Sequence, residues 1–545
     1  MVGNPESSAK RYQECRRTDG IDRRRDCTNV RFCNAMRADV SVCFCIEQLD
    51  IDTCGALPLC SLTQGDRIMK ALFTICLLTI APLTAQPYDT VLRGGRVIDP
   101  ESKLDAIGDV AIRNGKIAAI SRNKLDGKTI FNASGMIVAP GFIDLHSHGQ
   151  DDANYRLKAM DGVTTALELE IGVADIDSYY NARSAGQIVN YGATIGHVPS
   201  RIQVMKDPTK SLVPNAAGAY KAASTEEITA LRRRIEHGLR RGAIGVGFGI
   251  QYTPAASRWE ILEMFRAAGN VHAPAFIHVR DMGNPEPKSA MAALEEIIAA
   301  GVTTGTPVHM VHVTSSSLQQ TPQVLATIAE ARSRGVDIST EAYSYTAALT
   351  DIASAIFAPG WQDVLGVSYG ALEWVETDER LTEARFNQLR PIGGHVIMHM
   401  IPESALEAAI RHPLVMIASD GGLEDGKGHP RSAGTYARVL GRYVREKQWI
   451  GWNEAIRKMA LMPAERLEKY VPSMRHKGRL AVGADADIVV FDPKTVIDNA
   501  TFGKPAIPST GMRFVLVNGT PVVRDGVLVD GAKPGTGVRA PILGM

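Results

Sequence analysis

Residues 137–149 read IVAPGFIDLHSHG, and this stretch indicates both the fold class and a first pair of metal ligands. It begins as an apolar run of β-forming residues and ends in DLHSH, in which His146 and His148 lie two positions apart. Residues two apart on an extended strand face the same side, so the two imidazoles can chelate one ion. The stretch therefore predicts a buried strand with a metal site at its carboxyl end.

Apolar, β-forming runs alternate with helical segments throughout residues 141–475. The runs after the first lie at 162–173, 193–198, 243–250, 275–280, 307–315, 336–345, 395–400 and 414–422. Strands buried on both faces that alternate with helices form parallel βα units. Together with the strand near Phe142 the runs number about eight, which predicts an α/β protein with a (β/α)8 TIM barrel over 141–475. The intervening segment 224–242 opens with Ser224 and Glu227 at the spacing of a helix capping box.

The two ends of the remaining chain have a different character. Short segments of alternating apolar and polar residues, broken by glycine, asparagine and proline, occupy 86–140 and 476–545. Asn518-Gly519 and Asp525-Gly526 are strong hairpin signals. Two all-β pieces at opposite ends pair most simply into one domain, so we expect a small β-sandwich built from both.

Composition excludes several classes of protein. The 545 residues are 45% hydrophobic and 22% charged, so the chain can bury a large core and is not disordered throughout. With 60 basic and 59 acidic residues the net charge is +1, which gives no electrostatic footprint for nucleic acid. No apolar run reaches the ~20 residues of a membrane-spanning helix.

All eight cysteines lie in the first 76 positions, before the β-rich and barrel-like segments begin. Residues 69–85 read MKALFTICLLTIAPLTA, with Lys70 before an apolar stretch and small residues at the end, as in a secretory signal peptide. We therefore expect an exported protein, periplasmic or extracellular. Residues 1–68 are then expected to be a spurious or non-native extension, and the alternative is a cysteine-rich prodomain.

Acidic and imidazole side chains end several of the later runs. Glu168 and Glu170 lie two apart in ALELEIG, and charges are costly to bury unless they are paired or bound to metal. A salt-bridged strand end is the alternative. His278 and His312 end two further runs, and neutral imidazole suits Zn²⁺. Reactive groups of TIM barrels lie at the carboxyl ends of the strands, so these residues are candidate ligands.

Asp420 ends the last run, VMIASD, and is followed by two glycines. A carboxylate at that position can ligate a metal and also accept the proton of an attacking water. The alternative is a simple helix N-cap. We take Asp420 as the candidate catalytic base.

The motifs PGFIDLHSH, GVTT, HVR, VHMVH, ASDGG and GADADIVVFDP resemble those of the amidohydrolase superfamily. The segments 190–201, 242–254, 341–345, 429–444 and 500–505 resemble the D-aminoacylases, or N-acyl-D-amino-acid deacylases, more closely. The resemblance implies a metal-bearing barrel with a β-sandwich, one or two Zn²⁺ ions, and hydrolysis of the linear amide of a small N-acylated amino acid to a carboxylate and a free D-amino acid. It implies that His146, His148, His278 and His312 are ligands and that Asp420 is the essential aspartate.

Two departures from the family pattern bear on the site. D-aminoacylases generally carry a metal-binding cysteine after GVTT, whereas this chain has ALELEIG, so Glu170 is the expected substitute and Glu168 the alternative. Many relatives carry a lysine two residues after the second ligand histidine, and here that residue is Thr314. The paired acids resemble a branch labelled N-acyl-D-glutamate deacylase.

The expected substrate-binding residues begin with Arg280 and Tyr252, which match positions in or beside the family's pocket. The planar fork of Arg280 suits a substrate carboxylate, and its rival role is a structural pair with Asp281 or Glu341. Further candidates are His197, Tyr343, Tyr345 and Arg431.

Three other functions fit parts of this pattern. A hydantoinase-like or dihydroorotase-like cyclic amidase would use the same metals and Asp420, but many such enzymes bridge their metals with a carboxylated lysine, for which no strand end offers a match. An exported dipeptidase-like enzyme would differ only in substrate. A metal-free scaffold of the same fold would have lost ligands that this chain retains.

Overall fold

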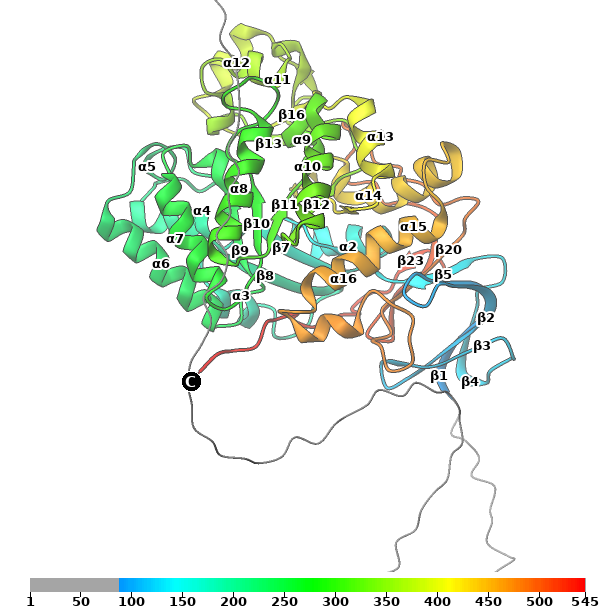
Figure 1. The fold of residues 1–545 in the computed structure, drawn as a ribbon. Helices are drawn as coiled ribbons and strands as arrows, with labels where there is room; N and C mark the ends of the chain where they lie inside the picture. The colour runs from blue at the N-terminus through cyan, green and yellow to red at the C-terminus, as the bar shows by residue number, and fades with distance from the viewer. Residues whose placement is uncertain (1–87, 545) are drawn as a thin grey trace, which may run out of the picture. The chain divides into compact units, whose positions relative to one another are not determined.

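The computed structural model describes residues 88–544, which fold as a parallel barrel, an inserted small sheet and a β domain (Figure 1). The expected signal peptide at 69–85 and the extension at 1–68 lie outside the described residues. Within 88–544, no helix is both long and apolar enough to cross a membrane.

Eight parallel strands form the barrel, in the sheet order β17-β12-β11-β10-β9-β8-β7-β6. Their bounds are β6 Phe142–Asp144, β7 Val163–Val173, β8 Asn190–Gly196, β9 Val246–Gly249, β10 Ala275–His278, β11 Val308–Met310, β12 Ile338–Ala342 and β17 Val415–Ile417. Apart from a half-buried Val173, every residue of these strands is buried, because helices cover the sheet from outside and side chains fill the inside. The predicted α/β barrel is confirmed.

Residues at the carboxyl ends of β6 and β17, and just beyond them, hold the two ends of this sheet together. The backbone N–H of His148, after β6, donates to the carbonyl of Gly421, after β17, at 2.9 Å. The carboxylate of Asp144 accepts from Ser419 N at 2.9 Å and from the buried Lys158 Nζ at 2.8 Å. The sheet is thus nearly closed, and the carboxyl ends of its first and last strands meet.

The run at 395–400 was predicted to be a barrel strand. That prediction is wrong, because the run does not belong to the barrel. It forms β16 (His395–Met398) of an antiparallel sheet with β13 (Ala348–Asp351), β14 (Leu372–Trp374) and β15 (Glu379–Arg380). This sheet is inserted between β12 and β17, and Figure 1 shows it with α11 and α12 at the top of the view. A short apolar run is equally compatible with a barrel strand and with an inserted strand, so the pattern alone could not separate them.

The helices have the following bounds: α2 Asp152–Met160, α3 Ile176–Asn181, α4 His197–Met205, α5 Ala217–Tyr220, α6 Thr225–Arg240, α7 Arg258–Gly269, α8 Ala290–Thr304, α9 Val313–Ser317, α10 Thr321–Ser333, α11 Trp361–Leu365, α12 Glu383–Leu389, α13 Glu403–Arg411, α14 Arg431–Arg438, α15 Trp452–Ile456 and α16 Met462–Leu467. The capping box predicted at Ser224 is present at the start of α6. This helix buries Leu231, Ile235 and Leu239, and each such side chain stabilises the fold by about 1.5–3 kcal/mol.

The β domain joins the two chain ends in one nine-stranded sheet. Its strands are β1 Tyr88–Asp99, β2 Leu104–Arg113, β3 Lys116–Ser121, β4 Gly127–Asn132, β5 Ile137–Pro140, β20 Ile488–Phe491, β21 Met512–Val517, β22 Thr520–Arg524 and β23 Val527–Leu528. The antiparallel pairing of β5 with β20 makes the junction, and Phe131 stacks on Phe514 at 4.8 Å across the enclosed core. Both predicted hairpins form, and Asn518 and Gly519 have the positive φ angles of a primed turn.

Candidate active site

The carboxyl ends of the barrel strands bring the predicted ligands together. His146 and His148 follow β6, Glu170 lies in β7, and His278 ends β10. His312 follows β11 and Asp420 follows β17. Because parallel strands of a barrel end on one face, residues far apart in sequence converge there.

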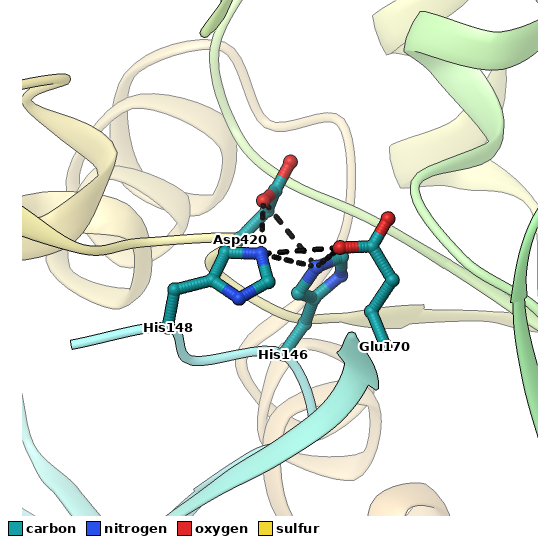
Figure 2. Close-up of side chains that lie close together, drawn as sticks. All are labelled: His146, His148, Glu170 and Asp420. Atoms are coloured by element: carbon teal, nitrogen blue, oxygen red, sulfur yellow. Dashed lines mark hydrogen bonds and ion pairs between the residues drawn. The ribbon is translucent and has the colours of Figure 1, made fainter. Parts of the chain in front are cut away.

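One group of side chains consists of His146, His148, Glu170 and Asp420, which point toward one another in Figure 2. The two Nε2 atoms are 3.1 Å apart, and Glu170 Oε2 lies 3.0 Å from that of His146 and 3.1 Å from that of His148. Asp420 Oδ1 lies 3.3 Å from each imidazole. Zinc bonds of 2.0–2.2 Å in a tetrahedron separate neighbouring ligands by roughly 3.4 Å, so this group fits one ion.

A second group shares Glu170 with the first. Its other oxygen, Oε1, lies 2.8 Å from His278 Nδ1 and 3.3 Å from His312 Nε2, and these two nitrogens are 3.1 Å apart. One carboxylate therefore faces two sets of imidazoles with its two oxygens. A carboxylate placed in this way could serve as a ligand to an ion in either group, and all three side chains of the second group are buried.

The outer nitrogens of the ligand histidines are held by other side chains. His146 Nδ1 lies 2.7 Å from Glu341 Oε1, and His148 Nδ1 lies 2.8 Å from Glu168 Oε2. Such contacts fix the tautomer and direction of a ligand imidazole. Glu168 thus contacts the outer nitrogen of His148. Of the two glutamates, Glu170 is the one that faces the other candidate ligands.

Two of the supporting contacts carry no sequence signal that we recognised. His278 Nε2 lies 2.7 Å from Gln251 Oε1. Glu341 Oε2 also contacts His309 Nε2 at 3.1 Å, so His309 supports His146 through that carboxylate. Burial alone would raise the pKa of Glu341, but its contacts with His146 and His309 lower it to about 2, which keeps it an anion.

Asp420 is held by Arg431 on the side away from the histidines. Arg431 Nη2 lies 2.9 Å from Asp420 Oδ2, and Nε donates to the Asp420 carbonyl at 2.6 Å. Burial by itself would raise the pKa of Asp420, but Arg431 and His146 hold it well below its usual value. The residue is not a helix cap, because the strands β18 (Leu423–Glu424) and β19 (Lys427–Gly428) follow it. Asp420 is therefore an anion facing both imidazoles.

The candidate substrate residues divide into two sets. Tyr252 and Arg431 line a cavity of about 280 Å³ together with His148, Glu170, His278, His312 and Asp420. Tyr343, His197, Tyr345 and Arg280 are absent from its described lining. The Tyr343 ring lies over the Arg431 guanidinium, 4.5 Å from its carbon.

The residues outside the lining have structural partners. Arg280 donates from Nε and Nη2 to Glu296 at 2.9 and 2.8 Å. It therefore forms a structural ion pair, which was the alternative role, but its partner is Glu296 and not Asp281 or Glu341. The buried His197 lies 2.8 Å from Glu260, and Tyr345 Oη lies 3.2 Å from Asp498. Their strand-end positions were visible in the sequence, but the directions of their side chains were not.

A parallel barrel with four imidazoles and two carboxylates converging at the carboxyl ends of its strands defines a metal-dependent hydrolase. The model of the amidohydrolase family matches residues 129–523, and the chain belongs to that family.

Individual relatives cover most of the chain. It is 31% identical over 487 residues to an N-acyl-D-glutamate deacylase of Alcaligenes xylosoxydans xylosoxydans, covering 80% of this chain and 94% of that relative. A D-aminoacylase of the same organism is 31% identical over 488 residues, covering 80% and 95%. The structure of an N-acyl-D-glutamate deacylase from Bordetella bronchiseptica, complexed with zinc and a phosphonate mimic of the tetrahedral intermediate, superposes with a TM-score of 0.71 at 28% identity, covering 84% of this chain and 100% of that one.

Proposed function

We propose that this protein is a zinc-dependent N-acyl-D-amino-acid deacylase, which hydrolyses a linear amide to a carboxylate and a free D-amino acid. The observation that carries the proposal is the pair of ligand groups joined by Glu170 in a barrel of the amidohydrolase family. Similarity to two deacylases along 80% of the chain supports the substrate class.

The donor atoms of the two groups fit zinc. All are imidazole nitrogens or carboxylate oxygens in a buried site, and these are ordinary zinc ligands. No lysine is among the described residues that line the cavity, and Glu170 faces both groups, which favours Glu170 over a carboxylated lysine as their shared ligand. Bound there, a divalent metal supplies a Lewis acid for the amide carbonyl and lowers the pKa of water.

Asp420 performs the proton transfers in this proposal. Its carboxylate accepts a proton from the attacking water while the water oxygen bonds to the amide carbon. The C–N bond then breaks, and the protonated Asp420 returns that proton to the leaving nitrogen. One water is consumed, and the products are a carboxylic acid and an amine. Arg431 holds Asp420 in the direction that both transfers need.

Amine release from matched N-acetyl-D- and N-acetyl-L-amino acids tests the proposal, with protein stripped of metal and then reconstituted with Zn²⁺. Hydantoins and dipeptides are assayed alongside. Zinc-dependent release from the D-series is the expected result. Activity confined to the rings or the dipeptides would replace the deacylase by a cyclic amidase or a dipeptidase on the same metal centre.

We also propose that the enzyme is exported to the periplasm or the extracellular space. Lys70, the apolar residues 71–83 and the small residues that follow support a signal peptide at 69–85. N-terminal sequencing of the protein recovered from a secreting host should find a first residue close to Gln86. A cell-retained protein that begins at Met1 or Met69 would contradict this.

A further inference from the structure

A buried lysine joins the first and last strands of the barrel. Lys158 of α2 is 1% exposed, and its Nζ donates to Asp144 Oδ2 at 2.8 Å and to Ser419 Oγ at 2.5 Å. Asp144 ends β6, whereas Ser419 follows β17 and directly precedes Asp420. Among residues 88–544, neither the two ligand groups nor the cavity lining includes Lys158. Its ammonium group therefore contacts the strand ends that carry the ligands, and not the ligands themselves.

The hydroxyl of Ser419 is the centre of these contacts. It accepts from Lys158 Nζ and from Gly421 N at 3.0 Å, and it donates to Asp144 Oδ2 at 2.6 Å or to the His146 carbonyl at 3.0 Å. The other oxygen of Asp144 accepts from Ser419 N at 2.9 Å. Buried hydrogen-bond networks rigidify the groups that they join. This network therefore fixes the end of the last strand against the end of the first.

Asp420 has an unusual backbone conformation within this network. Its φ is 51°, in the left-handed region that residues other than glycine seldom adopt. Such a conformation persists only where the surrounding structure imposes it, and it is concentrated at functional sites. The residues on both sides, Ser419 and Gly421, are held by the network. A Cβ on Gly421 would lie 3.0 Å from Lys158 Nζ, so the glycine leaves room for the lysine beside this turn.

We propose that Lys158 and Ser419 are positioning residues for the hydrolysis, which hold Asp420 where its carboxylate accepts and returns the proton. The inference rests on the deacylase function proposed above. Arg431 contacts the Asp420 carboxylate directly, whereas Lys158 acts on its backbone through Ser419. Loss of the ammonium group would leave Asp144 buried without its cation and release the strand end. A displacement of about 1 Å in a reacting group costs on the order of 10²-fold in rate.

The test compares two lysine variants of the zinc-loaded full chain, Lys158→Met and Lys458→Met. Lys458 is the matched control, because it is also buried and its Nζ donates to the Val415 carbonyl at 2.9 Å, at the amino end of the same strand β17. A merely structural role predicts the same kinetics for both variants. We expect Lys158→Met to lose about 10–100-fold in kcat, with KM within about threefold of wild type and zinc retained. Lys458→Met should keep both constants.

Ser419→Ala is a second variant that leaves the ion pair of Lys158 and Asp144 in place. It removes the hydroxyl between the lysine and the backbone and should lose about 10-fold in kcat. In the double variant with Lys158→Met the two losses should not multiply, because both changes break the same connection. Losses that multiply, or a wild-type kcat in Lys158→Met, overturn the inference. If Lys158→Met does not fold, a wild-type kcat in Ser419→Ala overturns it.

A measurement without substrate separates this inference from the proposed function. The visible absorption of cobalt-loaded protein depends on the geometry of the metal ligands, of which Asp420 is a candidate. The spectra of Lys158→Met and Ser419→Ala should differ from that of wild type, and the spectrum of Lys458→Met should match it. Wild-type spectra in all three overturn the inference. No amine release from any D-substrate by zinc-loaded wild type overturns the deacylase, while the spectra still test whether Lys158 and Ser419 position Asp420.

Discussion

Glu168 and Glu170 lie two residues apart on β7, yet they contact opposite sides of the metal-ligand cluster. Glu170 places Oε2 3.0 Å from His146 Nε2 and Oε1 2.8 Å from His278 Nδ1, so it faces both ligand groups. Glu168 instead lies 2.8 Å from His148 Nδ1, the nitrogen that points away from the centre. The two acids of one motif therefore have different roles, one as the shared ligand and the other as support for a ligand.

Asp420→Asn should abolish most turnover while leaving metal in place. The amide cannot accept the water's proton, and positioned acid–base groups contribute about 10²–10⁴-fold in rate. The histidines and Glu170 still offer ligands to both groups. Steady-state assays and metal analysis of the same preparation check this, with the exposed Asp425→Asn as control. Near-normal activity would remove Asp420 from its role as base.

Glu341→Gln should weaken metal binding without removing a ligand. Glu341 holds His146 Nδ1 at 2.7 Å as an anion, and loss of such support typically costs 10–100-fold in metal affinity or activity. Competition with a chelator measures the affinity. Glu373→Gln is the matched control, because that buried carboxylate contacts His399 at 2.9 Å in the inserted sheet. Equal chelator sensitivity of the two variants would show that the contact between Glu341 and His146 does not contribute to metal affinity.

Arg201→Met should destabilise the fold by about 3–5 kcal/mol at neutral pH, because it leaves Glu260 buried beside His197 without the guanidinium that pairs with it. Although burial raises the pKa of Glu260, His197 and Arg201 lower it below 4.5. This stabilisation is therefore present above pH 4.5 and is lost as pH falls through the folded-state pKa.

Denaturant unfolding across pH 3–7 checks the sign of this effect. The difference between wild type and Arg201→Met should narrow toward acid pH, where Glu260 becomes protonated. Arg334→Met, which removes an exposed pair with Glu330, is the control and should change little. A gap that widens toward acid pH would contradict the proposed ion pair.

The sequence predicted the barrel and the convergence of the candidate ligands because both depend on the order of residues along strands. His146, His278 and Asp420 could be placed because the ends of parallel strands share one face of a barrel. Side-chain direction beyond the strand ends could not be predicted in this way. Arg280 looked suited to a substrate carboxylate, but Glu296 of α8 binds it instead.

The apolar part of the cavity lining, to which Met398 and Met400 contribute, had no sequence signal. Met398 lies in β16, an apolar run that was predicted to be a barrel strand. Its contribution to the cavity depends on the tertiary position of an insertion, which periodicity does not report. The choice between the two glutamates likewise required the position of His148, since both acids end the same strand.

The most direct test of a metal centre bridged by Glu170 is the zinc content of stripped and reconstituted protein. Wild type should bind two equivalents per chain. Glu170→Ala, which removes the carboxylate shared by both groups, should bind at most one and lose its activity. Glu168→Gln is the neighbouring control and should still bind two. If Glu170→Ala also retains two equivalents, Glu170 does not bridge the ions and the site must be assembled in another way.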